Sequence, residues 1–205
     1  MYLALRGLLD RLSAEADLIP EPRNKELAIL ANYLKKKESH PVHLNFICTH
    51  NSRRSHLGMI WAAVAAAHYG VENVYTYSGG TEATAFNPRA ISALKRAGFK
   101  IVNPGGANPH YQVSFSENES PLVCFSKEYN HPDNPSKDFA AIMTCSDADE
   151  NCPLILGASF RLPLTYEDPK VADDTPFEAE RYDERVAQIG QEVLYAFSLV
   201  AATTK

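Results

Sequence analysis

Leucines fall three or four positions apart in two stretches near the start of the chain, residues 2–15 and 23–37. This spacing predicts two amphipathic helices. Lys35, Lys36 and Lys37 suit the C-terminal end of the second helix. Such helices more often cover a core than bind a partner. We therefore expect residues 1–41 to form an N-terminal helical extension that packs on the rest of the chain.

From residue 42 onward, short apolar runs alternate with helical patterns. The expected strands are 42–47, 74–77 and 140–144, and the expected helices are 55–69, 88–97 and 177–200. This alternation indicates a parallel sheet that is covered on both faces. We expect residues 42–205 to form one α/β domain. It would be a three-layer sandwich around a central parallel sheet of about four strands in the doubly wound order.

Residues 103–137 are the least regular part of the chain. Glycines and prolines mark several turns there, and 113–115 and 122–125 are two candidate short strands. Cys124 lies between apolar neighbours in the second of these, which favours a core position for its side chain.

Composition limits the possible classes of protein. The chain has 205 residues, 45% of them hydrophobic, and a net charge of −5, which fit a globular domain and argue against general nucleic-acid binding. No run reaches the roughly 18 apolar residues of a membrane span, and the start of the chain lacks the layout of a signal peptide. We expect a cytoplasmic protein, whose four cysteines are then catalytic or metal-binding rather than paired in structural disulfides.

One of these cysteines opens a Cys-x5-Arg loop. Cys48 ends an apolar strand, and Arg54 precedes a helix. Backbone N–H groups in such a loop, together with the helix dipole, bind a tetrahedral oxyanion. Arg54 can bind two of its oxygens, and the same field stabilises the nucleophilic thiolate of Cys48.

The other loop residues are mostly poor core residues, which favours a functional loop over a chance motif around a buried cysteine. We expect Ser55 to hydrogen-bond the sulfur of Cys48 and Asn51 to tie the loop together, while Arg53 adds charge or points to solvent. The remaining candidate oxyanion-binding residues are Thr49, His50 and Ser52.

A second pair of cysteines, Cys145 and Cys152, follows the predicted strand 140–144. In a parallel sheet Cys145 would lie at the same edge as Cys48. The acidic residues between the pair suggest an exposed, mobile turn. Three roles compete for the pair: a zinc site, for which further ligands nearby are lacking, a structural role, and a redox relay through thiol–disulfide exchange.

The segment from Phe46 to Ser55 resembles the low-molecular-weight protein tyrosine phosphatases, and more closely the thioredoxin-coupled arsenate reductases. The run from Cys145 to Pro153 is similar to the redox segment of those reductases. The stretches 75–80, 87–91 and 167–169 also fit in order. The resemblance extends from about Val42 to the C-terminal helix.

The resemblance implies a mechanism. Cys48 attacks arsenate held by the loop and Arg54, and Asp168 protonates the leaving oxygen as a general acid. Cys145 then attacks Cys48 and arsenite leaves, after which Cys152 moves the disulfide to Cys145–Cys152. Thioredoxin would be the external reductant, and neither a tightly bound cofactor nor a metal is expected. From the residues alone, Asp168 could equally be a turn residue before a proline.

Three features depart from that family: residues 1–41, the longer 103–137 region, and Met59. Met59 stands where the family usually has a glutamate that helps some reductases to bind potassium. Two other functions stay open. One is a phosphatase that forms a phosphocysteine at Cys48, and the other is a non-catalytic redox sensor or anion-binding module.

Overall fold

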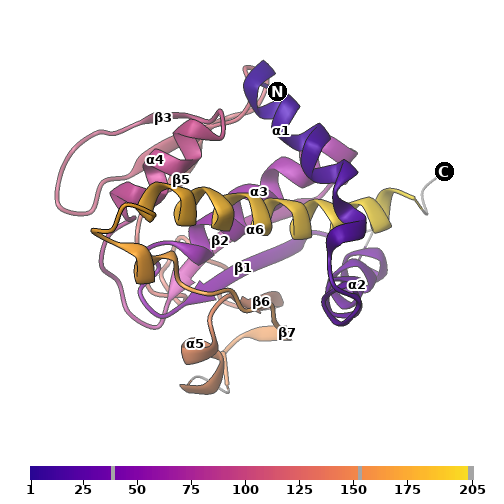
Figure 1. Ribbon diagram of the computed structural model, residues 1–205. Helices are drawn as coiled ribbons and strands as arrows, with labels where there is room; N and C mark the ends of the chain where they lie inside the picture. The colour runs from indigo at the N-terminus through magenta and orange to yellow at the C-terminus, as the bar shows by residue number, and fades with distance from the viewer. Residues whose placement is uncertain (38–39, 152–153, 203–205) are drawn as a thin grey trace.

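The computed structural model describes residues 1–37, 40–151 and 154–202. In this part of the chain a central sheet of four parallel strands has the order β2–β1–β6–β7 (Figure 1). The strands are β1 (Val42–Cys48), β2 (Val74–Gly80), β6 (Phe139–Met143) and β7 (Ala158–Pro163). The predicted α/β fold is confirmed. Because the order reverses beside β1, the loop after β1 lies at the topological switch point, where open α/β sheets bind ligands.

Alternate side chains of β1 and β6 enter two different cores. Phe46 and Ile142 belong to the large core, which contains residues of α3 (Arg54–Tyr69) and α6 (Glu178–Ala201). Both helices match the predicted ones closely. Ile47 and Met143 belong to a smaller cluster on the other side, together with Cys48, Cys145 and Ala148 of α5 (Ser146–Asn151). The two catalytic candidates, Cys48 and Cys145, therefore belong to the same small cluster.

The predicted N-terminal helices are present as α1 (Leu3–Ala14) and α2 (Glu21–Lys36), with a short 3₁₀ turn at Ala16–Leu18 between them. Both helices pack on α6, toward its C-terminal end (Figure 1). Pro22 lies in the first turn of α2, where the missing N–H has no helical partner to lose. The division between an extension and a domain at residue 41 stays a prediction.

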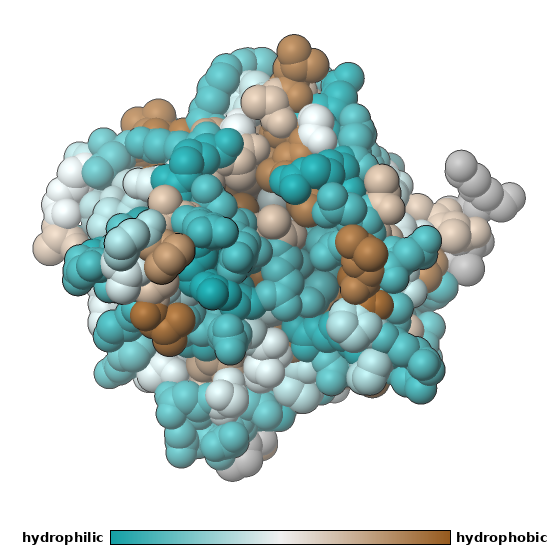
Figure 2. All heavy atoms as spheres, in the orientation of Figure 1, coloured by the Kyte–Doolittle hydropathy of each residue, from teal (hydrophilic) through white to brown (hydrophobic). Residues whose placement is uncertain are grey.

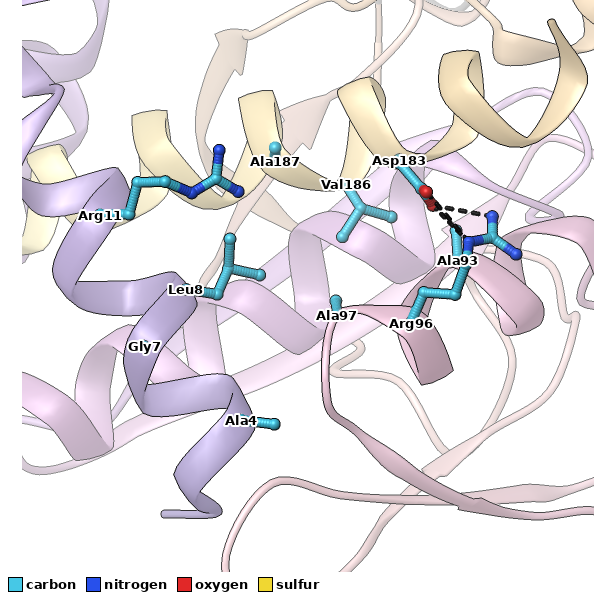
Figure 3. Close-up of a pocket in the computed structure, with 10 residues that line it drawn as sticks. All are labelled: Ala4, Gly7, Leu8, Arg11, Ala93, Arg96, Ala97, Asp183, Val186 and Ala187. Atoms are coloured by element: carbon cyan, nitrogen blue, oxygen red, sulfur yellow. Dashed lines mark hydrogen bonds and ion pairs between the residues drawn. The ribbon is translucent and has the colours of Figure 1, made fainter.

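A cavity of about 350 Å³ separates part of α1 from α4 (Pro88–Arg96) and α6 (Figure 3). Leu8 and Val186 point into it, Arg11 lies at one end, and Arg96 pairs with Asp183 at 2.7 Å at the other. Its lining includes no residue of the 48–55 loop, so the cavity is separate from that loop.

Residues 100–124 form a second, antiparallel sheet with the order β3–β4–β5. Its strands are β3 (Lys100–Val102), β4 (Tyr111–Ser114) and β5 (Leu122–Cys124). The two predicted short strands correspond to β4 and β5, whereas β3 was not predicted. After β5 the chain returns to the edge of the main sheet, where Glu128 forms a parallel bridge with Gly80. The insertion thus reaches the edge of the oxyanion loop.

The face shown in Figure 2 is mainly polar, and hydrophobic residues occur on it as separate spots, as is usual for a protein surface. Among the described helices, none combines the length and the apolar character that crossing a bilayer requires.

Candidate active site

The loop between β1 and α3 places Cys48 at the carboxyl end of β1, opposite Gly80 of β2. The thiol is buried, with 3% of the residue exposed. Asn51 adopts a positive φ of 43°, a conformation in which asparagine is several-fold enriched. This turn lets the chain curl tightly enough for α3 to begin at Arg54. The predicted strand–loop–helix arrangement is thus present.

A buried hydrogen-bond network ties the loop to Cys48. Ser55 Oγ lies 3.1 Å from Cys48 Sγ, and Asn51 Nδ2 donates to Ser55 Oγ at 2.8 Å. The Asn51 side-chain oxygen accepts a hydrogen bond from the backbone N–H of Lys127 at 2.9 Å. Since Asn51 holds the Ser55 oxygen on one side, the hydroxyl proton is free to point at the sulfur, where it stabilises a thiolate.

Arg54 joins the loop to the segment that carries Asp168. One terminal nitrogen donates to the backbone oxygen of Tyr166 at 2.9 Å, and the other lies 2.7 Å from a carboxylate oxygen of Asp168. The Arg54 Nε is buried and has no partner among the described residues. A buried N–H without a partner is costly, so this donor suits a bound oxyanion.

Arg53 does not point to solvent. Its side chain is 11% exposed, its Nε donates to the Tyr182 hydroxyl at 2.8 Å, and it lies 3.7 Å from Asp168 and 3.6 Å from Asp173. Burial, the largest cause, raises the pKa of Tyr182 to about 12. The phenol therefore stays protonated, and its hydroxyl donates a hydrogen bond to Asp173. Arg53 thus adds positive charge beside Asp168 from a fixed position.

The segments after β2 and after β5 form the outer wall of the loop. Ser52 Oγ donates to the backbone oxygen of Ala85 at 2.8 Å, and Thr84 Oγ1 and Ser126 Oγ both donate to the backbone oxygen of His50. The His50 ring is half-exposed and lies 2.8 Å from Glu82. His50 and Ser52 thus have their contacts with this wall.

Gly80→Ala should disrupt this wall. An added Cβ at Gly80 would lie 2.6 Å from the Thr49 backbone oxygen and 2.7 Å from the Asn51 nitrogen, and neither backbone atom can easily move. We expect a loss of about 2 kcal/mol in the free energy of unfolding, measured in urea. Gly7→Ala is the control, because nothing lies near its Cβ and alanine favours the α1 helix. Equal stability of the two variants would contradict the prediction.

Cys145 lies directly beyond β6 and beside the loop. It is 1% exposed, and Thr49 Oγ1 is 3.5 Å from its sulfur. Thr49 also donates to Asp147 at 2.6 Å. Cys145 and the residue next to Cys48 are therefore in contact, as expected for neighbouring parallel strands. Cys152, the third predicted redox cysteine, lies outside the described residues.

The expectation of a mobile turn after Cys145 was wrong for residues 146–151, which form the short helix α5. The Ala148 N–H donates to the Cys145 sulfur at 3.3 Å, and Arg161 of β7 lies 2.7 Å from the backbone oxygen of Asp149. These contacts hold the helix on the sheet.

Cys124 is fully buried in the large core, which confirms its predicted core position. Burial raises the pKa of its thiol to about 12.

Sequence reasoning missed a contact from the N-terminal extension. Arg23 of α2 donates to the backbone oxygen of Thr165 at 3.2 Å, and its guanidinium lies 4.8 Å from the Tyr166 ring centroid. Glu192 of α6 fixes Arg23 through a 2.7 Å ion pair. The N-terminal extension thus contacts Thr165 and Tyr166, which shortly precede Asp168 in the chain. No local sequence signal marks this long-range contact.

No group of three or more potential ligands (His, Cys, Asp or Glu) that could hold a metal occurs within the described residues. Met59 is buried in α3. His56, one turn earlier, is fully buried and stacks on Phe86 at 3.9 Å between ring centroids. Burial is the largest cause that lowers the His56 pKa, which keeps the ring neutral. The face of α3 behind the loop is therefore uncharged at these two positions.

No family model matches the chain. The chain is similar to arsenate reductases. It is 31% identical to arsenate reductase 2 of Staphylococcus epidermidis over 127 residues, which cover 60% of this chain and 76% of the relative. It is also 31% identical to arsenate reductase of Bacillus licheniformis over 150 residues, which cover 72% of this chain and 89% of the relative.

Solved structures show the same fold. A low-molecular-weight phosphotyrosine phosphatase from Vibrio cholerae superposes with a TM-score of 0.51 at 14% identity, covering 80% of this chain and 97% of the phosphatase. A structure described as an arsenate reductase in the phosphate-binding state gives a TM-score of 0.50 at 17% identity, covering 78% and 98%. The fold is therefore shared by phosphatases and reductases, so the choice between the two activities depends on the site itself.

Proposed function

Since the chain belongs to the arsenate reductase family and has the fold of the low-molecular-weight phosphotyrosine phosphatases, we propose that it reduces arsenate to arsenite through Cys48, Cys145 and Cys152, with thioredoxin or another thiol as electron donor. One observation carries this proposal: Cys145 lies at the same sheet edge as Cys48 and contacts Thr49, the next residue of the loop. A phosphatase that works through a phosphocysteine has no use for a second cysteine there.

The first step is binding of the oxyanion. The loop amides and the unpartnered Arg54 Nε supply donors to arsenate, and the start of α3 adds the positive end of its dipole. The Cys48 thiolate attacks arsenic(V). Asp168, in its protonated form, gives its proton to a departing arsenate hydroxyl, which leaves as water, and a Cys48–arsenic adduct remains. Arg54 holds Asp168 at the loop before the substrate arrives.

The second step transfers two electrons. The Cys145 thiolate attacks Cys48 Sγ, a Cys48–Cys145 disulfide forms, and the electron pair of the sulfur–arsenic bond stays on arsenic, which leaves as arsenic(III) in arsenite. Cys152 then attacks Cys145, releases Cys48 as a thiolate and forms a Cys145–Cys152 disulfide. A dithiol donor reduces this disulfide and closes the cycle. Cys145 is buried, so reduction requires a local rearrangement that exposes it.

Coupled turnover tests the proposal. We expect arsenate-dependent NADPH consumption in the presence of thioredoxin and thioredoxin reductase. Cys152→Ser should lose steady-state turnover but release about one arsenite per enzyme, because Cys48 and Cys145 suffice for a single reduction. Cys124→Ala is the matched control and should retain turnover, since Cys124 is buried in the large core. No turnover of the wild type with any dithiol donor would reject the reductase.

A phosphatase is the second candidate, because the geometry of Cys48, Arg54 and Asp168 also suits phosphocysteine formation. Aryl phosphate cleavage by this route would need Cys48 and Asp168 and survive the loss of Cys145 and Cys152. Weak cleavage is compatible with the reductase, because both reactions use one loop. Efficient cleavage without any arsenate turnover would make the protein a phosphatase.

A further inference from the structure

Asp168 lies on a segment that is fixed differently before and after this residue. Before it, the Leu164 N–H donates to the backbone oxygen of Met143 at 2.9 Å, which attaches the segment to the end of β6. After it, the chain forms a 3₁₀ turn, Pro169–Ala172, and Asp173 follows. A turn of four residues is too short to be stable alone, so its position relative to the loop depends on side-chain contacts.

Arg53, the residue directly before α3, reaches both ends of this turn. Its guanidinium lies 3.7 Å from Asp168, which precedes the turn, and 3.6 Å from Asp173, which follows it. The contact with Asp168 is to Oδ1, whereas Arg54 binds Oδ2 at 2.7 Å. The two arginines therefore contact different oxygens of one carboxylate, and Arg53 alone of the two links it to the far end of the turn.

Tyr182 of α6 fixes the position of Arg53. The residue is 1% exposed, and its hydroxyl accepts a hydrogen bond from Arg53 Nε and donates one to Asp173 Oδ1, both at 2.8 Å. A single buried hydroxyl thus joins the arginine to the carboxylate that ends the turn. Arg89 of α4 lies 3.6 Å from the same carboxylate. Asp173 is therefore held from α4 and α6 as well as by Arg53.

We propose that Tyr182 and Asp173 are positioning residues of the reaction, which hold Arg53 against Asp168 and so keep this carboxyl group in place beside the oxyanion loop. The inference rests on the role of Asp168 as general acid in the proposed function. Neither residue needs to touch the substrate, because both act through Arg53. Tyrosine suits this position because its hydroxyl is a donor and an acceptor at once, whereas phenylalanine supplies neither group.

Two aryl phosphates separate proton transfer from binding and from attack by Cys48. In both reactions a bond forms between Cys48 Sγ and phosphorus, and the bond from phosphorus to the phenolic oxygen breaks. Phenyl phosphate needs the Asp168 proton on that departing oxygen, whereas dinitrophenyl phosphate releases a stable phenolate without it. In Tyr182→Phe we expect kcat/KM for phenyl phosphate to fall roughly two- to tenfold, the effect of losing hydrogen bonds, and kcat/KM for dinitrophenyl phosphate to stay near wild type. Competitive inhibition by inorganic phosphate should not change.

Two neighbouring carboxylates give a matched pair of variants. Asp173→Asn should show the same selective loss for phenyl phosphate, since an amide lacks the charge that pairs with Arg53. Asp174→Asn is the control, because the Asp174 side chain is 87% exposed and pairs with Arg89 at 2.6 Å. Asparagine also tolerates the positive φ of 61° at this position. The control should leave kcat/KM for both aryl phosphates unchanged.

A double-mutant cycle shows whether Tyr182 acts through Asp168. In an Asp168→Asn background, Tyr182→Phe should have no further effect on phenyl phosphate cleavage. A further loss in that background, equal losses for both aryl phosphates, weaker inhibition by phosphate, or unchanged kinetics of Tyr182→Phe would each overturn the proposal. The test does not use Cys145, so absence of arsenate turnover alone would reject the reductase and not this inference. A wild type that cleaves neither aryl phosphate would overturn this inference as well.

Discussion

Cys145→Ser is expected to abolish arsenate turnover while Cys48 stays reactive. The serine hydroxyl retains the size and polarity of the side chain beside Thr49 and the Ala148 N–H, so the loop should keep its shape. A hydroxyl cannot form the disulfide that would drive arsenite from Cys48 in the proposed relay. The variant should therefore stop at the Cys48–arsenic adduct and release no arsenite, unlike Cys152→Ser, which should complete one reduction.

Three readouts on the same Cys145→Ser preparation separate loss of chemistry from loss of structure. Coupled NADPH consumption should fall to background, whereas alkylation of Cys48 and cleavage of an aryl phosphate should continue at rates near those of the wild type. These two reactions use only Cys48 and its loop. Arsenate reduction by Cys145→Ser over many turnovers at the wild-type rate would contradict the proposed relay. Loss of all three activities together would indicate that the substitution damages the loop.

The Cys48–Ser55 loop was predictable because its parts are neighbours in sequence. Cys48, Asn51, Arg54 and Ser55 span eight positions between an apolar strand and a helix, and their geometry follows from that local order. The position of Cys145 also followed, because parallel neighbouring strands bring their carboxyl ends to one edge. What the sequence predicted well therefore depends on short-range pattern and on one rule of sheet topology.

Besides β3, the elements β7 and α5 escaped prediction because neighbours in space form them. Strand β7 is an edge strand with Arg161 at its centre, and only Leu162 is buried among its six residues, so it lacks an apolar pattern. Helix α5 has six mainly polar residues, too few to form a helix alone. Contacts with Cys145 and Arg161 stabilise it. Tertiary contacts thus override the local signal in both cases.

The burial of Lys127 and the contacts of Arg23 are long-range for a different reason. A lysine or arginine in sequence is ordinarily an exposed side chain, and nothing beside Lys127 in the sequence indicates that this residue is buried. Likewise Arg23 meets Thr165 across 142 positions. Sequence periodicity predicted that the extension packs on the domain, but only the structure shows that it reaches the segment next to Asp168.

Arg54→Lys is expected to lower kcat/KM by about 10³-fold for arsenate and for an aryl phosphate alike, since removing one preorganised donor costs roughly 10²–10³-fold and Arg54 has more than one role. Lysine keeps the charge but lacks the planar fork. It cannot bind Tyr166, Asp168 and an oxyanion together, as the two terminal nitrogens and the free Nε of Arg54 can. Steady-state kinetics with both substrates measure the effect.

Arg53→Lys is the matched control for the same charge one residue earlier. Arg53 contacts Tyr182 and lies farther from Asp168 than Arg54 does, at 3.7 Å against 2.7 Å. We expect a loss of less than about tenfold, because lysine keeps the charge and loses mainly the hydrogen bond to the Tyr182 hydroxyl. A large loss of activity in Arg53→Lys together with a small loss in Arg54→Lys would show that Arg53, and not Arg54, binds the oxyanion. Because the two substitutions conserve net charge, any difference between them measures the geometry of the guanidinium and not the electrostatic field alone.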